Sequence, residues 1–148
     1  MTQTSNQFNL NVNKGELTAV YGGTPASMNA VVGASEASPI VPAQAVKLKD
    51  VAGAGIVITA VTATTDAVYG FVPYSLKTSS YLSEDNLKVS GDEAVMHMEA
   101  GAAIARGAEL EFVVTGSKVQ TQATGTVVGI ALDKATADGD IIRVQIKL

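Results

Sequence analysis

The sequence predicts an all-β fold, a small closed or nearly closed β-barrel domain with an extended N-terminal arm. Val, Ile and Thr number 19, 8 and 14 among 148 residues, and their branched Cβ atoms fit a pleated strand better than a helix. After residue 44, short apolar runs alternate with turn residues at the spacing of about 8 to 12 residues that is typical of sandwiches and barrels. With 47% hydrophobic and 16% charged residues, a chain of this length can bury one core.

Residues 1–44 form the predicted arm, which precedes a β-barrel-like domain over residues 45–148. The arm carries few charges, is rich in Asn, Gln, Ser and Ala, and contains three prolines. No long period of two or of about 3.6 residues runs through it. Phe8, Leu10 and Val12 alternate with asparagines, which is typical of a short strand that pairs with an edge elsewhere.

The first part of the barrel-like domain is expected to hold three strands. Alternating apolar and lysine residues at 46–49 indicate an exposed strand, and the apolar run at 56–61 indicates a central one. A third strand is expected at 67–72, where Pro73 ends it. Residues 75–86 have the composition of a loop.

Two hairpins are predicted next in the chain. Residues 87–98 contain two apolar runs around Gly91, which favours a tight turn with a positive φ. The Ala- and Gly-rich stretch 100–108 predicts a tight turn or a single helical turn, because alanine favours a helix and glycine interrupts it. Residues 109–122 alternate on both sides of a Thr-Gly-Ser turn at 115–117, which predicts the second hairpin.

The last two strands have a core face that alternation identifies directly. The connection between them, residues 133–140, is predicted to be a turn in which Asp side chains accept hydrogen bonds from nearby backbone amides. The expected inward-facing residues are Val128, Ile130 and Leu132 on one strand and Ile142, Val144, Ile146 and Leu148 on the other.

Charge and hydropathy argue against two classes of partner. Ten Lys and Arg residues against 14 Asp and Glu give a net charge of −4 and a pI near 4.8, with no basic run, so we expect no nucleic-acid partner. The uncharged stretches 17–35 and 51–65 are interrupted by Gly, Thr, Ser, Asn or Pro, so we expect no membrane partner. The first seven residues have no apolar or positively charged signal region, which favours synthesis in a cytoplasm.

The residue types needed for catalysis are scarce, so we predict no enzymatic activity, no metal site and no cofactor. The chain has no cysteine, and its one histidine, His97, is interpreted as a hydrogen-bonded strand residue. No Gly-x-Ser-x-Gly nucleophile motif occurs. Paired carboxylates of the glycosidase type are interpreted as solvated turn and strand residues. The carboxylates considered are Glu84, Asp85, Asp92, Glu93, Glu109 and Glu111.

Three segments resemble those of the capsid decoration, or cement, proteins of tailed bacteriophages. They are GAAIARGAEL at 101–110, GTVVGIAL at 125–132 and ADGDIIRV at 137–144. The resemblance implies a β-barrel or β-tulip domain that binds the outer surface of an icosahedral capsid and stabilises it by bridging major capsid subunits. It also implies a homo-oligomer, with a trimer favoured over a dimer. Phe8, Leu10, Val12 and Tyr21 are then the expected capsid or oligomer contacts.

Three alternative functions stay open. A β-rich phage tail or head-fibre component would be fixed at a tail or vertex instead of spread over the shell. A bacterial surface adhesin module is disfavoured because no secretion signal is visible. A carbohydrate-active enzyme or lectin is disfavoured because the chain has no Trp and a single His.

Overall fold

The computed structural model describes residues 13–18, 27–53 and 55–148, and it confirms the all-β class. These residues contain no helix, and therefore no helix that could span a membrane. The strands are β1 (Leu17–Thr18), β2 (Ser27–Val32), β3 (Ala45–Leu48), β4 (Val57–Ala60), β5 (Gly70–Phe71), β6 (Asn86–Ser90), β7 (Val95–Glu99), β8 (Glu109–Val113), β9 (Lys118–Thr121), β10 (Val127–Ala131) and β11 (Ile141–Ile146).

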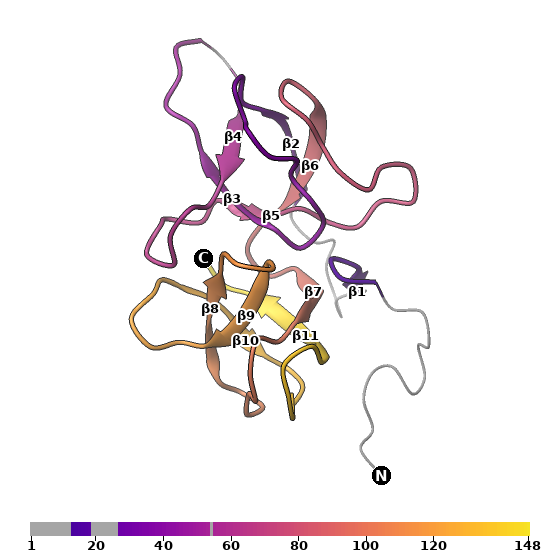
Figure 1. The fold of residues 1–148 in the computed structure, drawn as a ribbon, viewed down its shortest axis with the longest axis vertical. Coiled ribbons are helices and arrows are strands. Elements are labelled where there is room, and N and C mark those ends of the chain that lie inside the picture. Colours follow the sequence, from indigo (N-terminus) through magenta and orange to yellow (C-terminus); the bar gives the residue numbers. More distant parts are fainter. Residues whose placement is uncertain (1–12, 19–26, 54) are drawn as a thin grey trace.

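The first unit is a closed barrel with the strand order β2-β4-β3-β5-β6 (upper part of Figure 1). Strand β2 runs parallel to β4 and antiparallel to β6, and the pairing of Phe71 with Ser90 joins β5 to β6. Closure leaves no free sheet edge, and the inward-facing side chains fill the interior. The buried interior residues are Ala30, Val32, Ile40, Val46, Ile58, Val72, Leu87 and Val89.

The second unit is a six-stranded sheet with the order β1-β7-β11-β10-β8-β9 (lower part of Figure 1). The sheet curls until its last strand meets the chain that follows β7. There Val119 of β9 forms an isolated bridge with Ala100, and the Gly101 amide donates to the Val119 carbonyl at 2.8 Å. The sequence predicts one closed or nearly closed domain, whereas the described residues form a closed barrel and a second, curled sheet.

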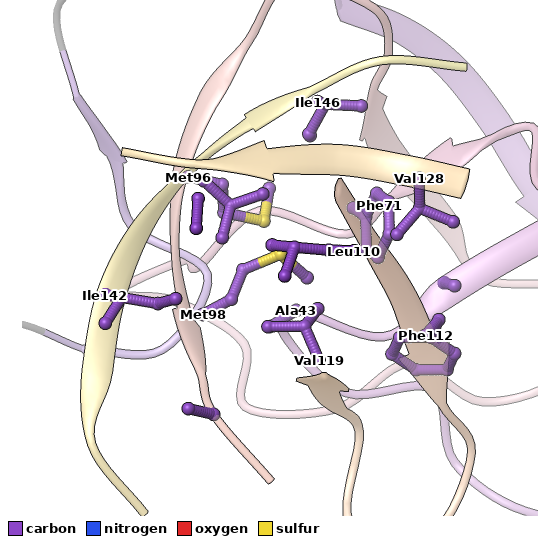
Figure 2. Packing of buried hydrophobic residues seen from close by; sticks show 14 of the residues in the cluster. Ala43, Phe71, Met96, Met98, Leu110, Phe112, Val119, Val128, Ile142 and Ile146 are labelled. Atoms are coloured by element: carbon purple, nitrogen blue, oxygen red, sulfur yellow. The ribbon is translucent and has the colours of Figure 1, made fainter. Parts of the chain in front are cut away.

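A continuous apolar core joins the two units. Phe71 of the barrel meets Phe112 of the second sheet edge to face, with ring centroids 5.8 Å apart and an interplanar angle of 73°. Ala43 and Phe71 lie in the same buried cluster as Met98 and Val119 (Figure 2). A backbone hydrogen bond of 2.8 Å from Thr126 to Thr64 adds a polar link, so the units pack as one body.

The prediction that residues 1–44 form an extended arm is wrong over part of this range. Residues 27–32, expected to lie in the arm, form strand β2 and pair with both β4 and β6. Ile40 pairs with Tyr81 and is fully buried. Met28, Ala30 and Val32 share the inward face of β2, but Val31 on the outward face is also apolar, so the two-residue period in the sequence covers only residues 27–30.

The prediction of a hairpin over residues 87–98 is also wrong. Strand β6 ends at Ser90 in the barrel and β7 starts at Val95 in the second sheet, so the two strands do not pair. The residue with positive φ between them is Glu93, at 72°, and Gly91 does not have one. The connection passes from one unit to the other. The second hairpin is confirmed, with Phe112 opposite Val119 and Gly116 at a φ of 79°.

The core face of the last two strands is confirmed in part. Ile142, Val144 and Ile146 are buried, whereas Leu148 lies past the end of β11 and is 45% exposed. The register between β10 and β8 shifts between Val127 and Gly129. This irregularity interrupts the alternation in β10, so Ala131 is buried and Ile130 and Leu132 are only half-buried.

Gly70→Ala should destabilise the protein by about 1 to 3 kcal/mol, because barrel closure leaves no room for a methyl group. A Cβ at Gly70 would lie 2.3 Å from Val89 Cγ1 and 2.7 Å from the Ser90 carbonyl oxygen. Gly101→Ala is the matched control, since its nearest new contact would be 3.6 Å away. Urea unfolding followed by circular dichroism measures both variants. Equal stability of the two would show that β5 and β6 are not packed this closely.

Candidate contact surface

The structure confirms that His97 is a hydrogen-bonded strand residue. It lies in β7, is 5% exposed, and its Nδ1 is 3.2 Å from the Glu16 carbonyl oxygen. Opposite it across the strand pair is Arg143. Within residues 13–18, 27–53 and 55–148, no three His, Cys, Asp or Glu side chains are grouped so that they could hold a metal ion.

The interpretation of Glu111 as a solvated carboxylate is wrong. Its side chain is 3% exposed, and Oε2 accepts hydrogen bonds from the backbone amides of Ala123, Thr124 and Gly125 at 3.0, 3.2 and 2.6 Å. Gln120 Nε2 donates to Oε1 at 2.6 Å. These donors, above all the Ala123 amide, hold the pKa of Glu111 below its usual value. Glu111 therefore shapes the loop between β9 and β10, where the two units meet.

Aspartates fix two other turns in a similar way. Asp140 Oδ2 accepts from the backbone amides of Thr136 and Ala137 at 2.7 and 3.1 Å, as the sequence predicts for this turn. The Thr136 amide and hydroxyl lower the pKa of Asp140. Arg143 binds Asp133 through two side-chain nitrogens, at 2.9 and 2.7 Å, and lowers the pKa of that carboxyl. These carboxylates hold turns in place.

Residues 13–18 are attached to the second sheet. Strand β1 pairs with β7, the Gly15 amide donates to the His97 carbonyl at 2.7 Å, and Tyr74 donates to the Gly15 carbonyl at 2.9 Å. Lys14 Nζ lies 3.5 Å from Glu99 Oε2 and donates to the Gly116 carbonyl at 2.6 Å. This part of the predicted arm is therefore docked on the fold. The predicted contact residues, listed in chain order, are Phe8, Leu10, Val12 and Tyr21, and all of them lie outside the described residues.

The loop between β5 and β6, residues 72–85, presents large apolar side chains to solvent. Leu76 is 92% exposed and Leu82 is 59% exposed. The C-terminal half of the loop is fixed, because Tyr81 and Ile40 exchange backbone hydrogen bonds at 2.8 and 2.9 Å and Leu82 donates to Asp85 Oδ2 at 2.7 Å. The loop projects from the side of the barrel (Figure 1). The loop therefore exposes two leucines that no sequence pattern singled out.

Between this loop and the outer face of the barrel lies a hollow of about 670 Å³. On the barrel side, Asn29 of β2 is directly opposite Lys88 of β6, and both are exposed. They face outward because they alternate with the buried Ala30, Leu87 and Val89. On the loop side the hollow is lined by tyrosine, lysine, serine and threonine side chains.

Comparison with known proteins identifies the fold and not a family. No protein-family model matches the chain, and a search of the curated proteins finds no match. A solved structure is similar in fold to this chain. That structure is the head fiber gp8.5 N base in bacteriophage phi29, with a TM-score of 0.53 and 17% identity over 84% of this chain and 95% of that chain.

Proposed function

We propose that this chain is a non-enzymatic structural protein of a phage virion that binds the outer surface of the capsid. The observation that carries the proposal is the fold similarity to a phage head fiber base, which extends over 84% of this chain. The sequence resemblance of residues 101–144 to phage decoration proteins supports it independently. Synthesis in the host cytoplasm and assembly onto the head follow from this role.

In its finer form, the proposal is that the protein holds neighbouring major capsid subunits together. A protein that binds the assembled shell, and not the separated subunits, stabilises the shell by an amount that rises with the logarithm of its concentration over the dissociation constant. A homo-oligomer, with a trimer as the favoured state, presents several contacts at once, so modest affinity at each site gives firm attachment.

A head-fibre base is the second candidate, and the same head fiber similarity favours it. The two roles differ in their effect on the stability of the shell. A cement protein covers the shell and raises its stability, whereas a fibre base carries a further projecting segment and leaves shell stability unchanged. A tail or single-vertex component would be present in only a few copies.

We expect purified protein to bind heads that lack it at a fixed, symmetry-related copy number. It should also raise the temperature at which they release their genome, because the bound copies oppose subunit separation. Co-sedimentation with quantitative gel analysis gives the copy number, and dye access to DNA during heating gives the release temperature. Binding without any rise would favour the fibre base. Absence of binding to the head would contradict both roles.

The shell or oligomer contact is assigned, in this proposal, to Phe8, Leu10, Val12 and Tyr21. Replacing the first three with Ser should abolish binding to heads, because it removes the apolar side chains of the expected strand. Leu76→Ser is the control, since it removes an equally apolar side chain that is 92% exposed on the β5–β6 loop. If Leu76→Ser abolishes binding and the triple variant does not, the contact lies on the loop instead.

A further inference from the structure

The hollow between the β5–β6 loop and the barrel has the volume of a small-ligand site. Its volume of about 670 Å³ falls within the range of about 300 to 1,000 Å³ that is usual for such sites. Both walls are built on ordered backbone. Strands β2 and β6 pair over five residues on one side, and the Tyr81 bridge to Ile40 fixes the loop on the other.

The charge in the hollow is opposite to that of the whole protein. Lys77 and Lys88 line it and no Asp or Glu does, although the chain has a net charge of −4. Among the other described lysines, Lys14, Lys47 and Lys118 each lie within 4 Å of a carboxylate, whereas Lys49, Lys134 and Lys147 do not. Lys77 and Lys88 have no such ion pair among the described residues. Two unneutralised ammonium groups at one hollow favour an anionic ligand.

The other lining residues combine two aromatic rings with hydrogen-bonding groups. Tyr74 and Tyr81 are half-buried, so each ring offers an apolar face beside a hydroxyl group. Asn29 and Asn86 supply amide donors and acceptors. A ligand that matches this lining carries many hydroxyl groups on an apolar ring and at least one negative charge.

We propose that this hollow binds an acidic saccharide, a sugar that carries a carboxylate or a phosphate group. Lys77 and Lys88 contact the anionic group, the tyrosine rings pack against the sugar ring, and the two asparagines bond its hydroxyls. The proposal goes beyond the structural role of the chain and does not depend on it. Nucleic acid is the less favoured ligand, because binding a strand needs a basic groove along the backbone and the chain has no basic run.

Titration of the ¹⁵N-labelled full-length chain with glucuronic acid, glucose 6-phosphate and glucose tests the site by NMR. We expect both acidic sugars to shift the amides of residues 74–78 and 86–88, and glucose to shift them far less at equal concentration. A response to only one acid would identify the anionic group as carboxylate or phosphate. An equal response to glucose, or no response to either acid, would overturn the proposal.

Lys88→Gln should weaken the binding of the effective acid by about fivefold, because it removes one charge and keeps a hydrogen-bonding side chain of similar length. Lys147→Gln is the matched control, since Lys147 is an exposed lysine at the end of the second unit and does not line the hollow. Equal affinity of the two variants would overturn the assignment. Stronger shifts with an eight-residue oligothymidylate than with either sugar would replace it with a nucleic-acid site.

Discussion

Glu111→Ala should lower the free energy of unfolding by about 3 kcal/mol, because it removes the acceptor of four hydrogen bonds at once. Three of the donors are consecutive backbone amides, and the Gly125 amide is buried at 2.6 Å from Oε2. A buried donor left without a partner costs about 1 to 3 kcal/mol. Gly125 also lies against Thr64 of the barrel, so the loss should loosen the junction of the two units. Urea unfolding at neutral pH measures the change.

Glu111→Gln is the matched control, and it separates hydrogen bonding from charge. The amide oxygen of Gln can accept from the three backbone donors, so we expect a loss of about 1 kcal/mol. The pKa of Glu111 is lowered in the folded state, so its ionic contribution is complete above the unfolded pKa of about 4.3 and is lost as the pH falls through the lower folded value. The stability gap between the native chain and the Gln variant should therefore shrink between pH 7 and pH 3. A constant gap, or equal losses for Ala and Gln, would contradict this account.

The position of Glu111 could not be predicted from its strand. Glu111 alternates with Leu110 and Phe112, and alternation normally places the polar residue in solvent. In the structure the loop between β9 and β10 folds back over that face and supplies amide donors to it. The donors are 12 to 14 residues away in sequence, and no local pattern indicates that the loop returns.

Strand existence was more predictable than strand pairing. The strands at 45–48 and 57–60, the second hairpin and the last strand pair follow from short apolar runs and turn residues. The same local pattern around Gly91 fits a hairpin as well as a crossing between units, and only tertiary packing decides between them. Strand β2 could not be predicted because its alternation covers only residues 27–30 and ends in the apolar pair Val31 and Val32.

The hollow was predictable only in part. The sequence identified residues 75–86 as a loop, and that loop supplies Lys77 and Tyr81. Asn29 precedes Lys77 by 48 positions and Tyr81 by 52, and it reaches the hollow because β2 pairs with β6. The absence of Trp disfavours a saccharide ligand, but Tyr74 and Tyr81, which the fold brings to the same hollow, supply aromatic rings in its place.

Val144→Asn should lower the free energy of unfolding by about 3 to 5 kcal/mol. Val144 is fully buried in β11, which lies between β7 and β10, and it pairs with Met96 and Ala131. The change removes apolar contacts worth about 1.5 to 3 kcal/mol and buries an amide with no partner in the apolar core.

Gln145→Asn introduces the same side chain one position further along β11 and serves as the control. Gln145 is half-buried on the opposite face, where its Nε2 lies 3.3 Å from Glu93 Oε2, so the cost should stay below about 1 kcal/mol. Thermal and urea unfolding compare both variants with the native chain. Because successive side chains point to opposite faces, a register slip of one residue would reverse the order of the two effects. If both substitutions lower the free energy of unfolding by the same amount, β11 is not a central strand. The residues that form the core between the two units would then differ from those described above.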